Sequence, residues 1–197
     1  MAECLFCNIV SGKIPTLKVA EDDDFLAFLD INPSSPGHTV IIPKKHYSRL
    51  EDMPKSEAEA MFGFIQSLSK SVMKAMETEN CNIGLNVGKI AGQEIPHVHT
   101  HVIPRYEGDG GTAMQGIVRL AVKKEELPGI AEKIKAAVEG EPKKEEKAEP
   151  KREEPKKEEK PKESSRKEPA KGHEREWQEF LHKHQDDVEN LDEARNL

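Results

Sequence analysis

The chain has 197 residues, of which 35% are hydrophobic and 34% are charged, and its formal net charge is −7. This length accommodates one ordinary domain of about 140 residues with additional polar sequence. The negative charge and the lack of a basic, aromatic-rich segment predict that nucleic acid is not a partner. Without a long apolar run or a signal-like N-terminus, we expect a cytoplasmic protein with no membrane span.

Two of the three cysteines stand near the N-terminus as Cys4-x-x-Cys7. In a reducing compartment such a pair indicates metal or redox chemistry more often than a structural disulfide. The pair supplies only half of a four-ligand metal site, so the other ligands must come from distant parts of the chain.

Two strands are predicted in the first part of the chain, at residues 22–31 ("DDDFLAFLDI") and 37–43 ("GHTVIIP"). Loop-forming residues separate them. Apolar residues at helical spacing then predict a long amphipathic helix, with Ser56 and Glu59 as its capping box. Residues 81–87 alternate apolar with polar or small side chains, which predicts a half-buried strand.

Residues 127–140 read as a last helix, with Pro128 at its start and Gly140 at its end. Short loops between these elements favour antiparallel pairing, because parallel strands need a helical crossover. We therefore predict an α+β fold and a domain over residues 1–139. Residues 140–172, rich in lysine, glutamate and proline, predict a disordered linker, and residues 173–197 a short amphipathic helix that could dock on a protein partner.

Three histidines recur at every second position in "PHVHTHVIPR", residues 96–105. In an extended strand His97, His99 and His101 share one face, and Val98 and its even-numbered neighbours form the packing face. Histidines that only satisfy one another are one interpretation. A metal site made of all three is disfavoured, because same-face neighbours lie about 6.5 to 7 Å apart. A nucleophilic imidazole with a hydrogen-bond donor beside it fits the pattern better.

This stretch matches the His-φ-His-φ-His-φ-φ signature of the histidine triad (HIT) family, which the chain resembles over residues 4 to about 110. "CLFCNIVSGKIPT", "FLAFLDINPSSPGHTVIIPKKH", "GLNVG" and "AGQEIPHVHTHVIPRYEGD" follow in the order of that family. The resemblance implies a five-stranded antiparallel sheet and a homodimer that binds purine nucleotides. It also implies hydrolysis through a nucleotidyl-histidine intermediate, with His99 as the nucleophile and His101 as donor to the phosphoryl oxygens.

The resemblance further implies which residues contact the nucleotide. Asp30 would bind the ribose hydroxyls, with Phe28 and Ile31 against the base, and Glu94 stands where several relatives have a hydroxyl residue. In chain order, the implied nucleotide-binding residues are Phe28, Asp30, Ile31, His38, Asn86, Gly92, Gln93, Glu94, His99 and His101.

Some members with the N-terminal cysteine pair bind zinc, and the resemblance implies such a structural zinc site here, held by Cys4, Cys7, His46 and His97. The function that we expect is therefore hydrolysis of nucleoside phosphoramidates or dinucleoside polyphosphates. Two alternatives remain open: a nucleotide-binding adaptor with little catalysis, and a nucleotidyltransferase. The second is disfavoured because related transferases carry glutamine at the position of His101.

Overall fold

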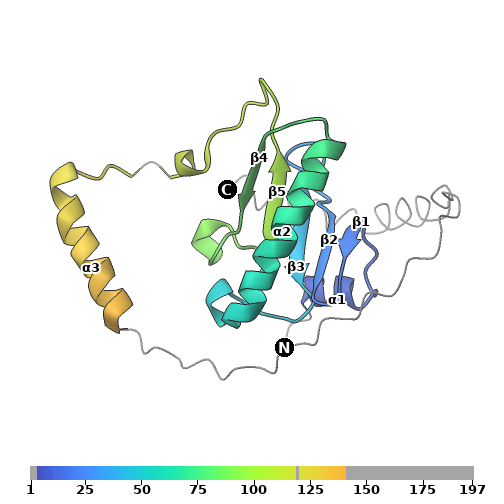
Figure 1. Cartoon of the computed structure of the whole chain (residues 1–197), viewed down its shortest axis with the longest axis horizontal. Helices are drawn as coiled ribbons and strands as arrows, with labels where there is room; N and C mark the ends of the chain where they lie inside the picture. Colours follow the sequence, from blue (N-terminus) through green and yellow to red (C-terminus); the bar gives the residue numbers. More distant parts are fainter. Residues whose placement is uncertain (1–3, 119, 141–197) are drawn as a thin grey trace, which may run out of the picture. The chain divides into compact units, whose positions relative to one another are not determined.

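The computed structural model describes residues 4–118 and 120–140, which fall into two units divided after Met114. The first unit contains five strands and two α-helices (Figure 1): α1 (Leu5–Val10), β1 (Lys18–Glu21), β2 (Phe25–Leu29), β3 (Thr39–Pro43), α2 (Lys55–Ala75), β4 (Cys81–Gly84) and β5 (Thr100–Pro104). Short 3-10 helices lie at Leu50–Asp52, Lys89–Ala91, Met114–Gly116 and Lys124–Glu126. In the described residues, no helix has the length and apolar character of a membrane span.

The strands form one antiparallel sheet in the order β1-β2-β3-β5-β4. This confirms the predicted α+β fold with a five-stranded antiparallel sheet. The sequence pattern had indicated the strands at β2, β3, β4 and β5. β1 follows no clear alternation, because three of its four residues are exposed at the edge of the sheet.

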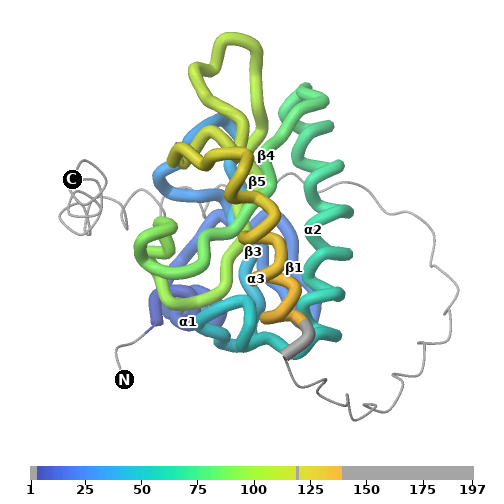
Figure 2. The backbone as a smooth tube through the Cα atoms, turned by 90° about the vertical axis from the view of Figure 1, so that its left-hand side faces the viewer, coloured from blue at the N-terminus to red at the C-terminus, as the bar shows by residue number. Residues whose placement is uncertain are grey.

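Both faces of the sheet are covered, each by one helix (Figure 2). On one face Phe25, Ala27 and Ile41 pack with α2, while Leu26 and Val40 point to the other face and pack with α1. Central strands that are buried on both faces read as continuous apolar runs, as in "FLAFL" and "TVIIP".

Helix α2 confirms the predicted long helix, and its buried residues recur at helical spacing, with Met61, Ile65, Leu68 and Val72 packed on the sheet. The predicted capping box is wrong. The helix begins at Lys55 with Pro54 as its N-cap, and no side chain caps it. Ser56 therefore lies inside the first turn, where its hydroxyl cannot take the N-cap position.

The edge strand β4 is shorter than the alternating pattern predicted, since it ends at Gly84. Ile83 pairs with Val102 of β5 and so lies on the α2 face, yet its side chain is 39% exposed. α2 packs against β3 and β5. The alternation therefore predicted correctly which face of the sheet Ile83 lies on, but not how much of that face α2 covers.

In the second unit, α3 (Leu127–Gly140) confirms the predicted last helix. The predicted linker beyond Gly140 and the predicted helix at 173–197 lie outside the described residues, and the domain boundary at residue 139 stays a prediction.

Two glycines with similar φ values distinguish the cost of backbone strain from the cost of side-chain crowding. Gly12 and Gly37 have similar φ values, +75° and +79°, but a Cβ at Gly12 would meet nothing within 4 Å, whereas at Gly37 it would lie 2.5 Å from Met76 Cγ. We expect Gly12→Ala to lower the free energy of unfolding by about 1 kcal/mol and Gly37→Ala by about 2 to 4 kcal/mol, because only the second adds overpacking. Urea unfolding measures both, and equal losses would contradict the role of crowding.

Two buried threonines on the sheet differ in hydrogen bonding. Among the described residues, Thr100 has a buried side-chain oxygen with no hydrogen-bond partner, whereas Thr39 Oγ1 donates to the Gly37 carbonyl oxygen at 2.9 Å. Thr100→Val should raise the free energy of unfolding by about 1 kcal/mol, and Thr39→Val should lower it by a similar amount. Thermal and urea unfolding check this pair, and a loss of stability in Thr100→Val would contradict the prediction.

Candidate functional site

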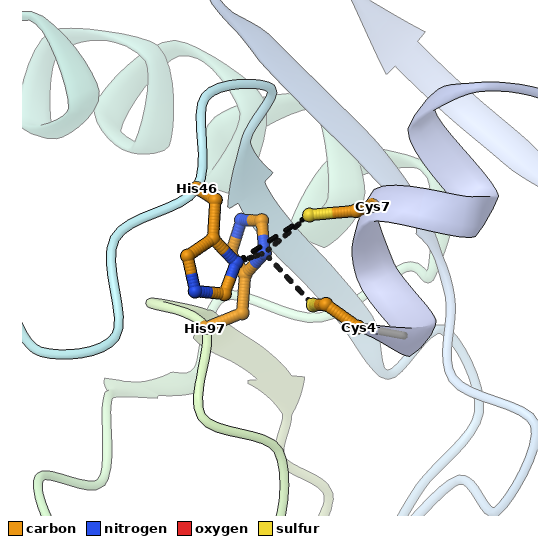
Figure 3. Close-up of side chains that lie close together, drawn as sticks. All are labelled: Cys4, Cys7, His46 and His97. Atoms are coloured by element: carbon orange, nitrogen blue, oxygen red, sulfur yellow. Dashed lines mark hydrogen bonds between the residues drawn. The ribbon is translucent and has the colours of Figure 1, made fainter. Parts of the chain in front are cut away.

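Four predicted metal ligands meet where α1, the loop after β3 and the approach to β5 come together (Figure 3). The Nδ1 atom of His97 lies 3.4 Å from Cys4 Sγ, 3.7 Å from Cys7 Sγ and 3.2 Å from His46 Nδ1. Cys7 Sγ lies 3.4 Å from His46 Nδ1. Residues that are up to 93 positions apart in the chain thus present their ligand atoms to one point.

The ring of His97 is held in one neutral form. Its Nε2 lies 2.9 Å from the Pro43 carbonyl oxygen, which can only accept, so Nε2 carries the proton and Nδ1 offers a lone pair to the cysteines. The side chain is fully buried, and burial lowers the pKa of His97 to about 4. The ring is therefore uncharged at neutral pH, as a metal ligand must be.

The spacing of these atoms fits a tetrahedral metal ion. Zinc with two sulfur and two nitrogen ligands at ordinary bond lengths places its ligand atoms about 3.3 to 3.8 Å apart. The four separations that join Cys4, Cys7, His46 and His97 run from 3.2 to 3.7 Å. Burial and the neighbouring Cys4 raise the pKa of the Cys7 thiol, and a bound cation would offset both effects. The group can therefore hold a metal ion.

His99 is oriented by a backbone group. Its Nδ1 lies 2.7 Å from the carbonyl oxygen of His97, so Nδ1 donates and the lone pair of the neutral ring is on Nε2. The side chain is 6% exposed, and its ring lies edge-on to that of His101 with the centroids 5.1 Å apart. An imidazole with a free Nε2 lone pair is suited to nucleophilic attack.

His38 and His101 form a chain of hydrogen bonds that ends beside His99. The backbone N–H of Ser34 donates to His38 Nδ1 at 3.1 Å, so the proton of neutral His38 is on Nε2. That nitrogen donates to His101 Nδ1 at 2.9 Å. The proton of neutral His101 is then on its Nε2, and this N–H can be donated to a ligand.

The Asp30 carboxylate lies beside these two histidines, with Oδ2 3.6 Å from His38 Nε2 and 4.0 Å from His101 Nδ1. The three side chains are close enough to share a cation. However, a metal ion would need an unprotonated Nε2 on His38, whose Nδ1 already accepts the Ser34 N–H. The arrangement is therefore better suited to passing a proton than to holding a metal ion, unlike the group around His97.

The loop before the histidines is held by Gln93. Its Nε2 donates to the Ser48 carbonyl oxygen at 2.7 Å, and its Oε1 accepts from Gly88 N at 2.8 Å. Asn86 Nδ2 donates to the Gly92 carbonyl oxygen at 3.3 Å. Both polar atoms of the Gln93 carboxamide are thus engaged by backbone, and its predicted contact with the nucleotide stays a prediction.

The other predicted nucleotide contacts differ in exposure. Phe28 is buried at 5% exposure, Ile31 is 40% exposed and Glu94 is exposed.

Phe6, to which the sequence pattern gave no role, packs edge-on against His97 and His99, with centroid distances of 5.7 and 5.2 Å. Its place between the two cysteines was the only signal in the sequence.

The chain is similar in sequence to known proteins. The model of the HIT domain matches residues 11–108. An uncharacterized HIT-like protein of Methanocaldococcus jannaschii is 46% identical over 134 residues, which cover 67% of this chain and 98% of that protein. The chain belongs to the HIT family.

Two further HIT relatives bear on the site. A protein of Schizosaccharomyces pombe named adenosine 5'-monophosphoramidase is 38% identical over 68% of this chain and 98% of its own length. The crystal structure of a zinc-bound histidine triad family protein from Mycobacterium smegmatis is 34% identical, with a TM-score of 0.54, and the match covers 68% of this chain and 97% of that one.

Proposed function

We propose that this HIT protein hydrolyses nucleotide conjugates at the α-phosphorus through a nucleotidyl-histidine intermediate on His99. The observation that supports this most is the hydrogen bond from His99 Nδ1 to the His97 carbonyl oxygen, because it leaves Nε2 as the reactive nitrogen. The substrates would be nucleoside phosphoramidates or dinucleoside polyphosphates. The relative named as a monophosphoramidase supports the former.

The reaction would take two displacements. In the first, Nε2 of His99 forms a bond to phosphorus while the bond to the leaving nitrogen or oxygen breaks, and the leaving group takes up a proton from solvent. In the second, water forms a bond to phosphorus, the bond to Nε2 breaks, and a proton passes to solvent. The Nε2–H of His101 would donate to a phosphoryl oxygen in both steps, where negative charge develops.

The hydrogen-bond chain behind His101 would support this donation. His38 fixes the proton of His101 on the nitrogen that faces away from His38, and the Asp30 carboxylate lies beside the pair. The same carboxylate, at the end of β2, is the proposed acceptor of the ribose hydroxyls. Further proposed contacts are Phe28 and Ile31 to the base, and Asn86, Gly92, Gln93 and Glu94 around the phosphate and the leaving group.

We further propose that zinc is the metal held by Cys4, Cys7, His46 and His97, because two thiolates and two imidazoles form a closed structural zinc site. The ion would supply a fixed cross-link between α1 and the approach to β5. The three cysteines are free in the structure, which agrees with a reducing, cytoplasmic location. A homodimer and a protein partner for the predicted C-terminal helix also stay proposals.

Replacing the nucleophile tests the proposed reaction. We expect His99→Ala to lower kcat for an adenosine phosphoramidate by at least about 10³-fold, because the covalent intermediate cannot form. Intact-protein and peptide mass spectrometry of the wild type during turnover should detect a nucleotidyl group on His99.

Thr100→Val provides the matched control, since Thr100 adjoins His99 but lies on the opposite, packing face. Its activity should equal that of the wild type. A wild type no more active than His99→Ala on phosphoramidates and dinucleoside polyphosphates would leave nucleotide binding without hydrolysis. An adduct on another residue would contradict the assigned nucleophile.

Metal analysis tests the zinc site. Protein purified under reducing conditions should contain about one zinc ion per chain, and Cys4→Ser should lower this to near zero, because a three-ligand site binds the ion much more weakly. Cys81→Ser, which changes the one cysteine outside the group, should keep the zinc content. Wild-type protein without zinc would contradict the proposal.

A further inference from the structure

His97 takes part in two interactions at once, one through its side chain and one through its main chain. Its side chain belongs to the four-residue metal group, and its main-chain carbonyl oxygen accepts the hydrogen bond from Nδ1 of His99 at 2.7 Å. Both ring nitrogens of His97 are engaged, Nε2 with the Pro43 carbonyl oxygen and Nδ1 with the cysteines. The position of the carbonyl that orients His99 therefore depends on the contacts of the His97 ring.

The backbone from His97 to His99 lies outside the sheet. Strand β5 begins only at Thr100, so ladder hydrogen bonds do not hold these three residues. Local support comes from the Val98 N–H, which donates to the Tyr47 carbonyl oxygen at 2.7 Å. Tyr47 follows directly after His46, so this hydrogen bond also connects the approach to β5 with the loop that carries a metal ligand.

Helix α1 provides a second connection from the metal group to His99. Phe6 stands between Cys4 and Cys7, is 6% exposed, and contacts the rings of both His97 and His99. A helix of six residues is not stable alone in water. Its place against the sheet depends on the burial of Phe6 and on the attachment of the two cysteines that flank it.

We propose that the group Cys4, Cys7, His46 and His97 positions the nucleophile in addition to stabilising the fold. With a metal ion bound, these four residues would fix the positions of the His97 carbonyl and the Phe6 ring, and these two contacts keep His99 in the Nδ1–H form with Nε2 free to attack. This rests on the proposed role of His99. Partners that orient the ligands of a metal site through hydrogen bonds change metal affinity or activity about 10- to 100-fold when altered, and we expect an effect of this order here.

The test compares the full-length wild type, Cys4→Ser and Cys81→Ser at one neutral pH. Ring ¹⁵N chemical shifts report which nitrogen of His99 is protonated, independently of activity. We expect a single Nδ1–H form in the wild type and in Cys81→Ser. In Cys4→Ser we expect a mixture of both tautomers, kcat lowered about 10- to 100-fold, and KM within about twofold of the wild-type value.

Removal of zinc from the wild type with a chelator is the second measurement, and it does not depend on how well Cys4→Ser folds. Added zinc should restore the tautomer and kcat of the wild type but not of Cys4→Ser. An active wild type whose His99 tautomer and kcat are unchanged by zinc removal would overturn the positioning role, as would a change confined to KM. A wild type inactive on every conjugate would refute the proposed reaction, while the tautomer comparison would still decide the positioning role.

Discussion

Backbone groups fix the tautomers of three histidines at the site, His38, His97 and His99. Carbonyl oxygens of Pro43 and His97 accept from Nε2 of His97 and Nδ1 of His99, and the Ser34 N–H donates to Nδ1 of His38. A carbonyl can only accept and an N–H can only donate, so each contact leaves one tautomer of a neutral ring. Three imidazoles of the same chemical type thereby become, in turn, a candidate metal ligand, a candidate nucleophile and a donor to His101.

The alternation of the sequence predicted which side chains share a face. His97 and His99 contact Phe6 of α1, His101 pairs with Val40 on the same face, and Val98 and Val102 pack under α2. The four ligands of the metal group also meet as the resemblance to the HIT family implied. These features could be predicted from the sequence because the period of a strand and the ligand types of a structural zinc site depend on which residues are present and at what spacing, more than on exact atomic positions.

Other features could not be read from the sequence because partners far apart in the chain determine them. The proton on His97 depends on the carbonyl oxygen of Pro43, which lies 54 positions away in the chain. Phe6 contacts the histidines only because α1 lies over the sheet. Likewise, the carboxamide of Gln93 forms hydrogen bonds with the backbone of two loops. No local sequence pattern indicates these contacts.

The spacing of side chains along an extended backbone also explains why the three histidines do not form one metal site. Same-face neighbours on a strand are about 6.5 to 7 Å apart, too far to share a small ion but close enough for their rings to touch. His97 turns toward the cysteines, whereas His99 and His101 lie edge-on to each other with their centroids 5.1 Å apart. The segment from His97 to His99 thus connects the four candidate metal ligands to the ring of the proposed nucleophile. The proposed positioning role follows from this connection, because the His97 carbonyl oxygen belongs to the residue whose ring lies in the metal group and also accepts the hydrogen bond from His99 Nδ1.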